Sequence, residues 1–206
     1  MTYPFSDRPE PKRYAELIGL VEKVKPETIV EIGVWKGKRA CQMAAAALSH
    51  NPFVVYTGFD LFEEATDETN EAELNAKRNI PLVRVTETLN RFKERFPGFS
   101  FQLIKGNTRE TLAGEQICAD FVFIDGGHSV DTIRSDYEAV KSSPVVVFDD
   151  YYSEDDAGNL GVNLNLVGAN RLVEELIEHK AVEIIHTGDK LKGGGCVDLA
   201  VVTERT

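Results

Sequence analysis

The chain has 206 residues, of which 42% are hydrophobic and 28% charged, and its formal net charge is −11. The acidic balance argues against a general nucleic-acid binder, which needs a basic face to displace counterions. No apolar run reaches the roughly 18 residues of a membrane span. The N-terminus is polar, with Asp7, Arg8, Glu10, Lys12 and Arg13, and lacks the apolar core of a signal peptide. We expect one domain over residues 1–206, located in the cytoplasm, with neither a nucleic acid nor a membrane as partner.

The first half of the chain alternates between helical and strand-like patterns. We expect a lead-in helix over 11–24, a strand over about 28–34, a helix to about 49 and a strand over 53–60. The longest insertion, 61–98, begins acidic and becomes helical around Val85 and Leu89. A third strand over 99–104 and a short helix over about 108–116 follow.

The second half continues the alternation with two apolar strands, over 119–125 and 144–150, on either side of a helix marked by Val130, Ile133, Tyr137 and Val140. The segment 151–167 is rich in Asp, Asn and Gly and is expected to be a mobile loop before a helix around Leu172. Two last strands, about 181–187 and 196–203, are joined by about eight turn-like residues.

This order of elements predicts an α/β fold. Continuous apolar strands mean that both faces of the sheet are covered, and the short final connection fits only an antiparallel hairpin. We therefore expect a three-layer, doubly wound and mostly parallel sheet of seven strands that ends in a C-terminal antiparallel hairpin, a Rossmann-like arrangement.

The most informative motif is Glu31-Ile-Gly33-Val-Trp-Lys-Gly37, at the junction of the first strand and its helix. Its glycine spacing differs from the Gly-x-Gly-x-x-Gly of dinucleotide sites and favours a nucleoside without a pyrophosphate, with S-adenosylmethionine as the leading candidate. Asp60 ends the next strand 23 residues after Gly37, near the offset at which an acid binds ribose hydroxyls. Asn107, after the third strand, is a candidate for the adenine edge.

Each of these residues also has a purely structural interpretation. Gly37 would serve as a tight turn, and Asp60 as a solvated strand end. Asn107 and Glu110 resemble a helix-capping pair.

A second cluster contains Asp125, after the fourth strand, and Asp149 and Asp150, after the fifth. Neighbouring parallel strands bring these carboxylates to one edge, where they would repel each other unless their pKa values rise or a cation joins them. Hard oxygen ligands select Mg²⁺, Mn²⁺ or Ca²⁺. The structural alternatives are a tight turn at Asp125-Gly-Gly and an exposed strand end at Asp149-Asp150.

On these motifs the chain resembles class I S-adenosylmethionine-dependent methyltransferases over nearly its whole length, especially the metal-dependent branch of macrocin-type sugar and catechol-type O-methyltransferases. The resemblance implies that Glu31 lies near the methionine amino group. It also implies that Asp125, Asp149 and Asp150 hold Mg²⁺ and that His128 is the general base, with Asp125 beside it in catalysis. Lys38-Arg39 departs from the family, which often has Ser or Thr just after the second glycine.

Other residues favour structural roles. His128 also fits an exposed turn before a helix capped by Ser129. Cys41, Cys118 and Cys196 form neither a disulfide framework nor a zinc site, and Cys41 and Cys118 are expected to be buried. The acidic run from Glu63 to Glu73 is a solvated face or part of a lid.

The sequence thus predicts a magnesium-dependent O-methyltransferase whose acceptor is a small molecule with adjacent oxygens, a sugar diol or a catechol. The alternatives are a metal-independent methyltransferase, a non-catalytic nucleoside-binding module of the same fold, and a nicotinamide-dependent oxidoreductase, against which the missing third glycine argues. Phe92 and Phe96 are candidates for a homodimer face.

Overall fold

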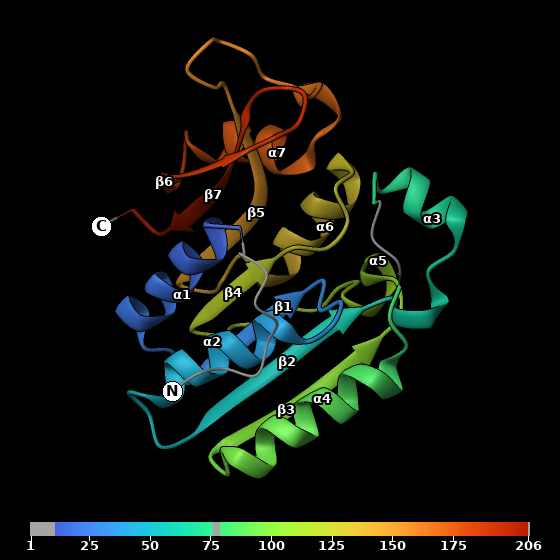
Figure 1. Ribbon diagram of the computed structural model, residues 1–206, viewed down its shortest axis with the longest axis vertical. Coiled ribbons are helices and arrows are strands. Elements are labelled where there is room, and N and C mark those ends of the chain that lie inside the picture. The colour runs from blue at the N-terminus through green and yellow to red at the C-terminus, as the bar shows by residue number, and fades with distance from the viewer. Residues whose placement is uncertain (1–10, 76–78, 206) are drawn as a thin grey trace.

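The computed structural model describes residues 11–75 and 79–205, so the acidic and basic residues Asp7, Arg8 and Glu10 lie outside the described part. Its centre is a seven-stranded sheet in the order β3-β2-β1-β4-β5-β7-β6 (Figure 1). The strands are β1 (Thr28–Ile32), β2 (Val54–Asp60), β3 (Phe99–Lys105), β4 (Phe121–Ile124), β5 (Val145–Ser153), β6 (Ala181–Lys190) and β7 (Cys196–Thr203).

Strands β1 to β5 pair in parallel, and β7 pairs antiparallel with both β5 and β6. The predicted doubly wound sheet with a C-terminal hairpin is therefore confirmed. The hairpin connection is shorter than predicted, because β6 continues to Lys190 and leaves only residues 191–195 between the strands.

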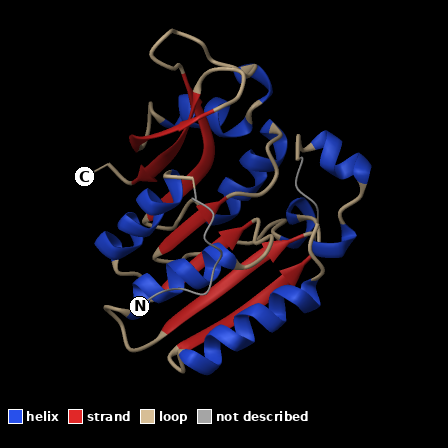
Figure 2. Ribbon diagram, viewed as in Figure 1, coloured by secondary structure: helices blue, strands red, loops and turns tan. Residues whose placement is uncertain are grey.

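Helices cover both faces of the sheet, as Figure 2 shows in blue on red. They are α1 (Arg13–Val24), α2 (Lys38–Leu48), α3 (Asp67–Ala72), α4 (Leu82–Arg95), α5 (Thr108–Thr111), α6 (Val130–Val140) and α7 (Gly168–Leu176). One apolar cluster joins the sheet to α1, α2 and α4, and a second joins its other face to α6 and α7. These two clusters are the outer interfaces of a three-layer fold.

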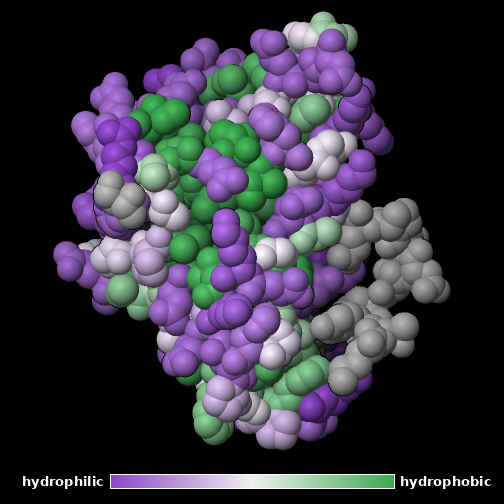
Figure 3. All heavy atoms as spheres, turned by 90° about the vertical axis from the view of Figure 1, so that its left-hand side faces the viewer, coloured by the Kyte–Doolittle hydropathy of each residue, from purple (hydrophilic) through white to green (hydrophobic). Residues whose placement is uncertain are grey.

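Helix α1 packs against α2 and against the β6–β7 hairpin. The half-buried Ile18 and Leu20 of α1 and Ile185 of β6 extend the first apolar cluster towards the surface. Figure 3 views this side of the molecule, where apolar side chains are gathered in the middle of a polar surround. Apolar packing thus fixes α1 beside the hairpin, which matters below because α1 begins at Arg13.

Several local predictions were wrong. The segment 151–167 is not simply a loop, because β5 continues through Ser153 and a 3-10 turn forms at Leu164–Leu166. The short helix after β3 ends at Thr111 rather than near 116. Cys118 is exposed. Phe92 is buried and packs edge-on against Phe99, so it is not available to a dimer face; the homodimer itself stays an untested prediction.

The strand order reverses between β1 and β4, and this is where ligands bind in open α/β sheets. Within the described residues, no helix has the length and apolar character that crossing a membrane would require.

Candidate functional site

Gly33 allows the ends of β1 and β4 to meet at the switch point. Its φ is +93°, and a Cβ at this position would lie 2.1 Å from the carbonyl oxygen of Asp125. Gly37 also has a positive φ, +72°, but a Cβ there would meet Val85 of α4 at 3.1 Å. The first glycine therefore permits close approach of two strand ends, whereas the second forms the turn into α2 beneath α4.

A cavity of about 290 Å³ opens at this switch point. Its walls include five of the residues that the sequence singled out: Gly33, Asp60, Asn107, Asp125 and His128. The insertion after β2 supplies a further wall through residues such as Ala65, Thr69 and Glu73. Glu31, Gly37, Asp149 and Asp150 are not among the lining residues.

Glu31 is fully buried within the sheet, where it accepts a hydrogen bond from the Tyr56 hydroxyl through Oε2. Its other oxygen, Oε1, accepts no hydrogen bond from the described residues. Burial raises the pKa of Glu31 well above its ordinary value, and the nearby charge of Asp125 adds to this, against the hydrogen bond from Tyr56. Glu31 is thus a buried support of the site rather than part of the cavity wall.

Asp60 organises the backbone around the cavity. One carboxylate oxygen accepts a hydrogen bond from the Trp35 amide at 2.8 Å, and the other accepts one from the Phe62 amide at 2.7 Å. Trp35 has a φ of +48°, which a non-glycine residue adopts only when its surroundings hold it there. Asp60 therefore fixes the β1–α2 loop, and it is not the solvated strand end of the structural alternative.

Asn107 acts as the N-cap of α5, because its Oδ1 accepts a hydrogen bond from the Arg109 amide at 3.0 Å. The capping alternative for this residue is confirmed. Asn107 also lines the cavity, so its capping role does not remove it from the site.

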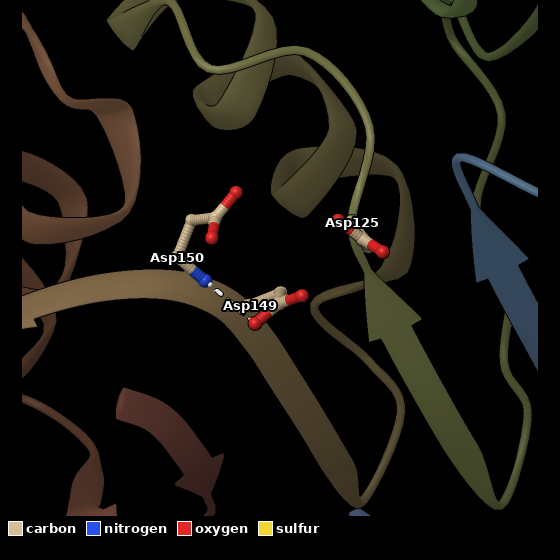
Figure 4. A group of neighbouring side chains, drawn as sticks. All are labelled: Asp125, Asp149 and Asp150. Atoms are coloured by element: carbon tan, nitrogen blue, oxygen red, sulfur yellow. Dashed lines mark hydrogen bonds between the residues drawn. The ribbon is translucent and has the colours of Figure 1, made fainter. Parts of the chain in front are cut away.

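The three carboxylates of the second motif do come together. Ile124 of β4 lies opposite Phe148 of β5, and this register places Asp125 beside Asp149 and Asp150. One carboxylate oxygen from each residue lies within 4.8 Å of the other two. Figure 4 shows Asp125 after the end of β4 and the other two on β5, with Asp149 turned towards Asp125. We call these three residues the acidic rim.

A distortion of β5 produces this arrangement. The pairing of β5 with β7 shifts between Phe148 and Tyr151, and Asp150 has a φ of +52°. The backbone amide of Asp150 donates to Oδ1 of Asp149 at 2.9 Å. Strained backbone of this kind clusters at functional sites, and here it aims two consecutive carboxylates into the same space.

The acidic rim has a cationic partner that the sequence did not reveal. Nε of Arg13, at the start of α1, lies 2.8 Å from Oδ1 of Asp149, and both side chains are nearly buried. Nη2 of Arg13 lies 3.8 Å from Oδ1 of Asp150. Burial and the charges of Asp125 and Asp150 raise the pKa of Asp149 well above its ordinary value, and Arg13 opposes this rise.

One observation indicates that the acidic rim suits a divalent cation. Oδ2 of Asp149 is buried and receives no hydrogen bond within the described chain. A buried carboxylate oxygen without a donor is costly, and a metal ion would satisfy it. The donor set consists of carboxylate oxygens, as Mg²⁺ prefers.

His128 is held by two acceptors. Its Nδ1 lies 2.9 Å from the carbonyl oxygen of Glu73, and its Nε2 lies 2.7 Å from Oδ2 of Asp150. Burial disfavours the charged ring, but the hydrogen bond and charge of Asp150 outweigh it and raise the pKa of His128 to about 9. Both ring nitrogens therefore carry protons near neutral pH, and His128 is a counter-ion of Asp150 in this arrangement.

Glu73 was also missed as an individual residue. Its carboxylate accepts hydrogen bonds from the Ser129 amide at 2.9 Å, the Ser129 hydroxyl at 3.1 Å and the Thr132 hydroxyl at 2.6 Å. Ser129 is the N-cap of α6, as the sequence suggested. Because Glu73 and Arg13 contact residues that are far from them in the sequence, no local sequence pattern could identify them.

Arg39, the second residue of the Lys38-Arg39 pair that departs from the family pattern, stacks on an aromatic ring of α1. Its guanidinium carbon lies 3.4 Å from the ring centroid of Tyr14. Burial lowers the pKa of Arg39, and the attraction of Tyr14 and Glu31 opposes this. The guanidinium is therefore part of the packing between α1 and α2 at the edge of the site.

Comparisons with known proteins agree with this fold. A family model described as a methyltransferase domain matches residues 30–151, from β1 into β5. The O-methyltransferase TomG from Streptomyces achromogenes, solved in complex with SAM, is 16% identical with a TM-score of 0.60, over 96% of this chain and 82% of that one. A search of curated proteins found no match.

Two further solved structures share the fold. The O-methyltransferase NovP is 15% identical with a TM-score of 0.64, over 95% of this chain and 80% of that one. An O-methyltransferase from Bacillus cereus in complex with SAH is 16% identical with a TM-score of 0.56, over 97% and 84%. At such low identity these matches describe the fold and leave the acceptor open.

Proposed function

The chain belongs to the methyltransferase-domain family, and from this premise we propose that it transfers a methyl group from S-adenosylmethionine to an oxygen of a small-molecule acceptor. The observation that carries the proposal is the cavity at the switch point, with the acidic rim beside it. A methyl donor and an acceptor oxygen must meet at such a junction, since methyl transfer is an in-line displacement that depends on alignment.

The cavity suits the cofactor. Gly33, Asp60 and Asn107 line it, and Glu31 and Gly37 support it from the same strand and turn. TomG, which shares the fold, was solved in complex with SAM. We assign the ribose to the side of Asp60 and the adenine to the side of Asn107.

We assign a divalent cation, Mg²⁺ by preference, to Asp125, Asp149 and Asp150. When bound, such an ion positions the acceptor and stabilises the negative charge that develops on its oxygen. The unsatisfied Oδ2 of Asp149 supports this assignment. Asp125 also lines the cofactor cavity, so it connects the two halves of the site.

His128 remains our candidate for the general base. In the present arrangement its Nε2 is engaged by Asp150, and it must lose that proton before it can accept another. Release of Asp150 towards a cation would free Nε2 and would lower the pKa of His128 towards its ordinary value.

A groove of about 430 Å³ beside His128 and Asp150 is the best candidate for the acceptor site. Its walls include Tyr152, Leu166 and Leu74, and the two leucines are more than half exposed. Exposed apolar side chains that line a groove beside polar groups are typical of small-molecule sites. We propose a sugar diol or a catechol as the acceptor.

Calorimetric titration with S-adenosylhomocysteine tests the function. We expect binding to the wild type and its loss in Asp60→Ala, which removes the anchor of the β1–α2 loop. Asp131→Ala, at an exposed acid of α6, is the matched control and should bind normally. Failure of the wild type to bind, with or without Mg²⁺, would refute the cofactor assignment.

A second candidate is methyl transfer without a metal. The observation that favours it is that Asp149 and Asp150 already have cationic partners in Arg13 and His128. In that case the acids only shape the acceptor pocket. Activity that survives exhaustive EDTA treatment would support this candidate, whereas activity lost to EDTA and restored by Mg²⁺ would support the metal.

A further inference from the structure

Arg13 is placed where a cation of the acidic rim would act. Its Nε forms a close ion pair with Asp149, its side chain is only 14% exposed, and that of Asp149 is 1% exposed. An arginine side chain stays charged at every pH that proteins tolerate. The rim therefore contains a permanent positive charge that belongs to the chain itself.

Asp189 of β6 holds Arg13 in this place. Its carboxylate accepts hydrogen bonds from the backbone amides of Lys12 at 2.8 Å and Arg13 at 3.0 Å, and lies 3.5 Å from Nη1 of Arg13. Amides at the start of a helix have no partners within the helix, and a carboxylate there is also favoured by the helix dipole. Asp189 thus fixes both the start of α1 and the direction of its first side chain.

The two carboxylate oxygens of Asp149 differ in their hydrogen bonding. Oδ1 is used by Arg13 and by the Asp150 amide, and Oδ2 is the buried oxygen that no described donor reaches. A metal ion would therefore bind Asp149 in the immediate neighbourhood of the guanidinium. Two cations at such short range in a poorly solvated site repel each other strongly.

We propose that Arg13, held by Asp189, is a built-in counter-ion of the acidic rim that sets how tightly the rim binds a divalent cation. The inference rests on the metal site of the proposed function. In this view α1 restrains metal binding, and weakening its hold on Asp149 strengthens the site.

Manganese binding, followed by the electron paramagnetic resonance of free Mn²⁺, tests the inference without any measurement of turnover. We expect Arg13→Gln to bind Mn²⁺ about tenfold or more tightly than the wild type, because one positive charge leaves the site. Asp189→Asn keeps the guanidinium but removes the carboxylate that shares it with Asp149, so Mn²⁺ should bind more weakly than in the wild type. Adding Asp149→Asn to Arg13→Gln should abolish the gain.

Arg134→Gln is the matched control, because Arg134 pairs with Glu175 on the exposed side of α6 and its loss changes the net charge equally. An affinity of Arg13→Gln within twofold of the wild type would overturn the inference. So would an equal gain in Arg134→Gln, unchanged or tighter Mn²⁺ binding by Asp189→Asn, or no Mn²⁺ binding by Arg13→Gln at millimolar concentrations.

The same samples distinguish this inference from the proposed function. Absence of S-adenosylhomocysteine binding would count against the function alone and would leave the manganese result intact. If Arg13→Gln does not fold, Asp189→Asn carries the test, because it keeps Arg13 and retains an acceptor for the α1 amides.

Discussion

The carbonyl oxygen of Glu73 lies 2.9 Å from Nδ1 of His128, and this contact joins the insertion after β2 to the loop after β4. The Glu73 carboxylate reinforces the junction through Ser129 and Thr132. One residue at the end of α3 thereby closes the wall of the cofactor cavity and orients the ring of the candidate base.

We predict that Glu73→Ala lowers the free energy of unfolding by about 2 kcal/mol, because buried donors at the start of α6 lose a charged acceptor. Hydrogen exchange of residues 65–75 should also quicken. Urea denaturation and exchange mass spectrometry measure the two effects. Glu71→Ala, at an exposed position of α3, should change stability by less than about 0.5 kcal/mol, and equal losses in both variants would contradict this account.

Gly33→Ala should be severely destabilising, by about 4 kcal/mol or more. The added Cβ would lie 2.1 Å from the Asp125 carbonyl oxygen, and the positive φ costs about 1–2 kcal/mol besides. Gly114→Ala is the matched control, since Gly114 has a φ of +74° but open space around it. Chemical denaturation should therefore show only the conformational cost at Gly114. Similar losses at both glycines would mean that close packing of β1 on β4 is unimportant.

Tyr56→Phe should destabilise the protein by about 1–3 kcal/mol, because the fully buried carboxyl of Glu31 loses the donor to its Oε2. The buried Tyr137, whose hydroxyl makes no hydrogen bond to another described residue, provides a control in Tyr137→Phe. Thermal unfolding of the two variants gives the comparison. A Tyr56→Phe protein as stable as Tyr137→Phe would show that the hydrogen bond contributes nothing.

Asp136 should make stability depend on pH. Burial raises its pKa from 3.8 to about 7, and the charge of Glu73 adds to the rise. The pKa of Asp136 is higher in the folded protein than in the unfolded chain. The free energy of unfolding therefore has its full contribution from neutral Asp136 below about pH 4, and this contribution is lost as the pH rises towards 7. The loss has an upper limit on the order of 4 kcal/mol.

Denaturation of the wild type and Asp136→Asn at pH 4, 5.5, 7 and 8 checks this prediction. The stability of Asp136→Asn relative to the wild type should increase with pH over this range, because the amide does not ionise. A constant difference across the series would rule out the shifted pKa as its cause.

The sheet was predictable because its strands are covered on both faces. Phe121–Ile124 is entirely buried, and such a run has no polar alternation to confuse it with a surface strand. The order of elements then predicted that the sheet ends in a hairpin and that Asp125 lies close to Asp149. The C-terminal part of β5 was missed because Asp149 and Asp150 suggested a strand end, whereas a bulge with a positive φ carries the strand past them.

The partners of the site residues were harder to predict than the residues themselves. Arg13 and Asp149 are far apart in the sequence, and their contact depends on how α1 docks against β6 through Asp189. Likewise, the two oxygens that accept hydrogen bonds from His128 belong to Glu73 and Asp150, in two different segments of the chain. Sequence patterns locate acids at strand ends, but the charge state of each depends on neighbours brought by tertiary folding.

The position of β7 has a consequence for assembly of the molecule. Among the described strands, β6 pairs only with β7, and β7 lies between β6 and β5. A chain that stops before Cys196 would leave β6 without a partner and would turn β5 into an open edge, prone to pairing with other chains. Such truncations should aggregate rather than fold into smaller domains. The eight residues of β7 thus decide whether the strand that bears Asp149 and Asp150 is an interior strand or an aggregation-prone edge of the sheet.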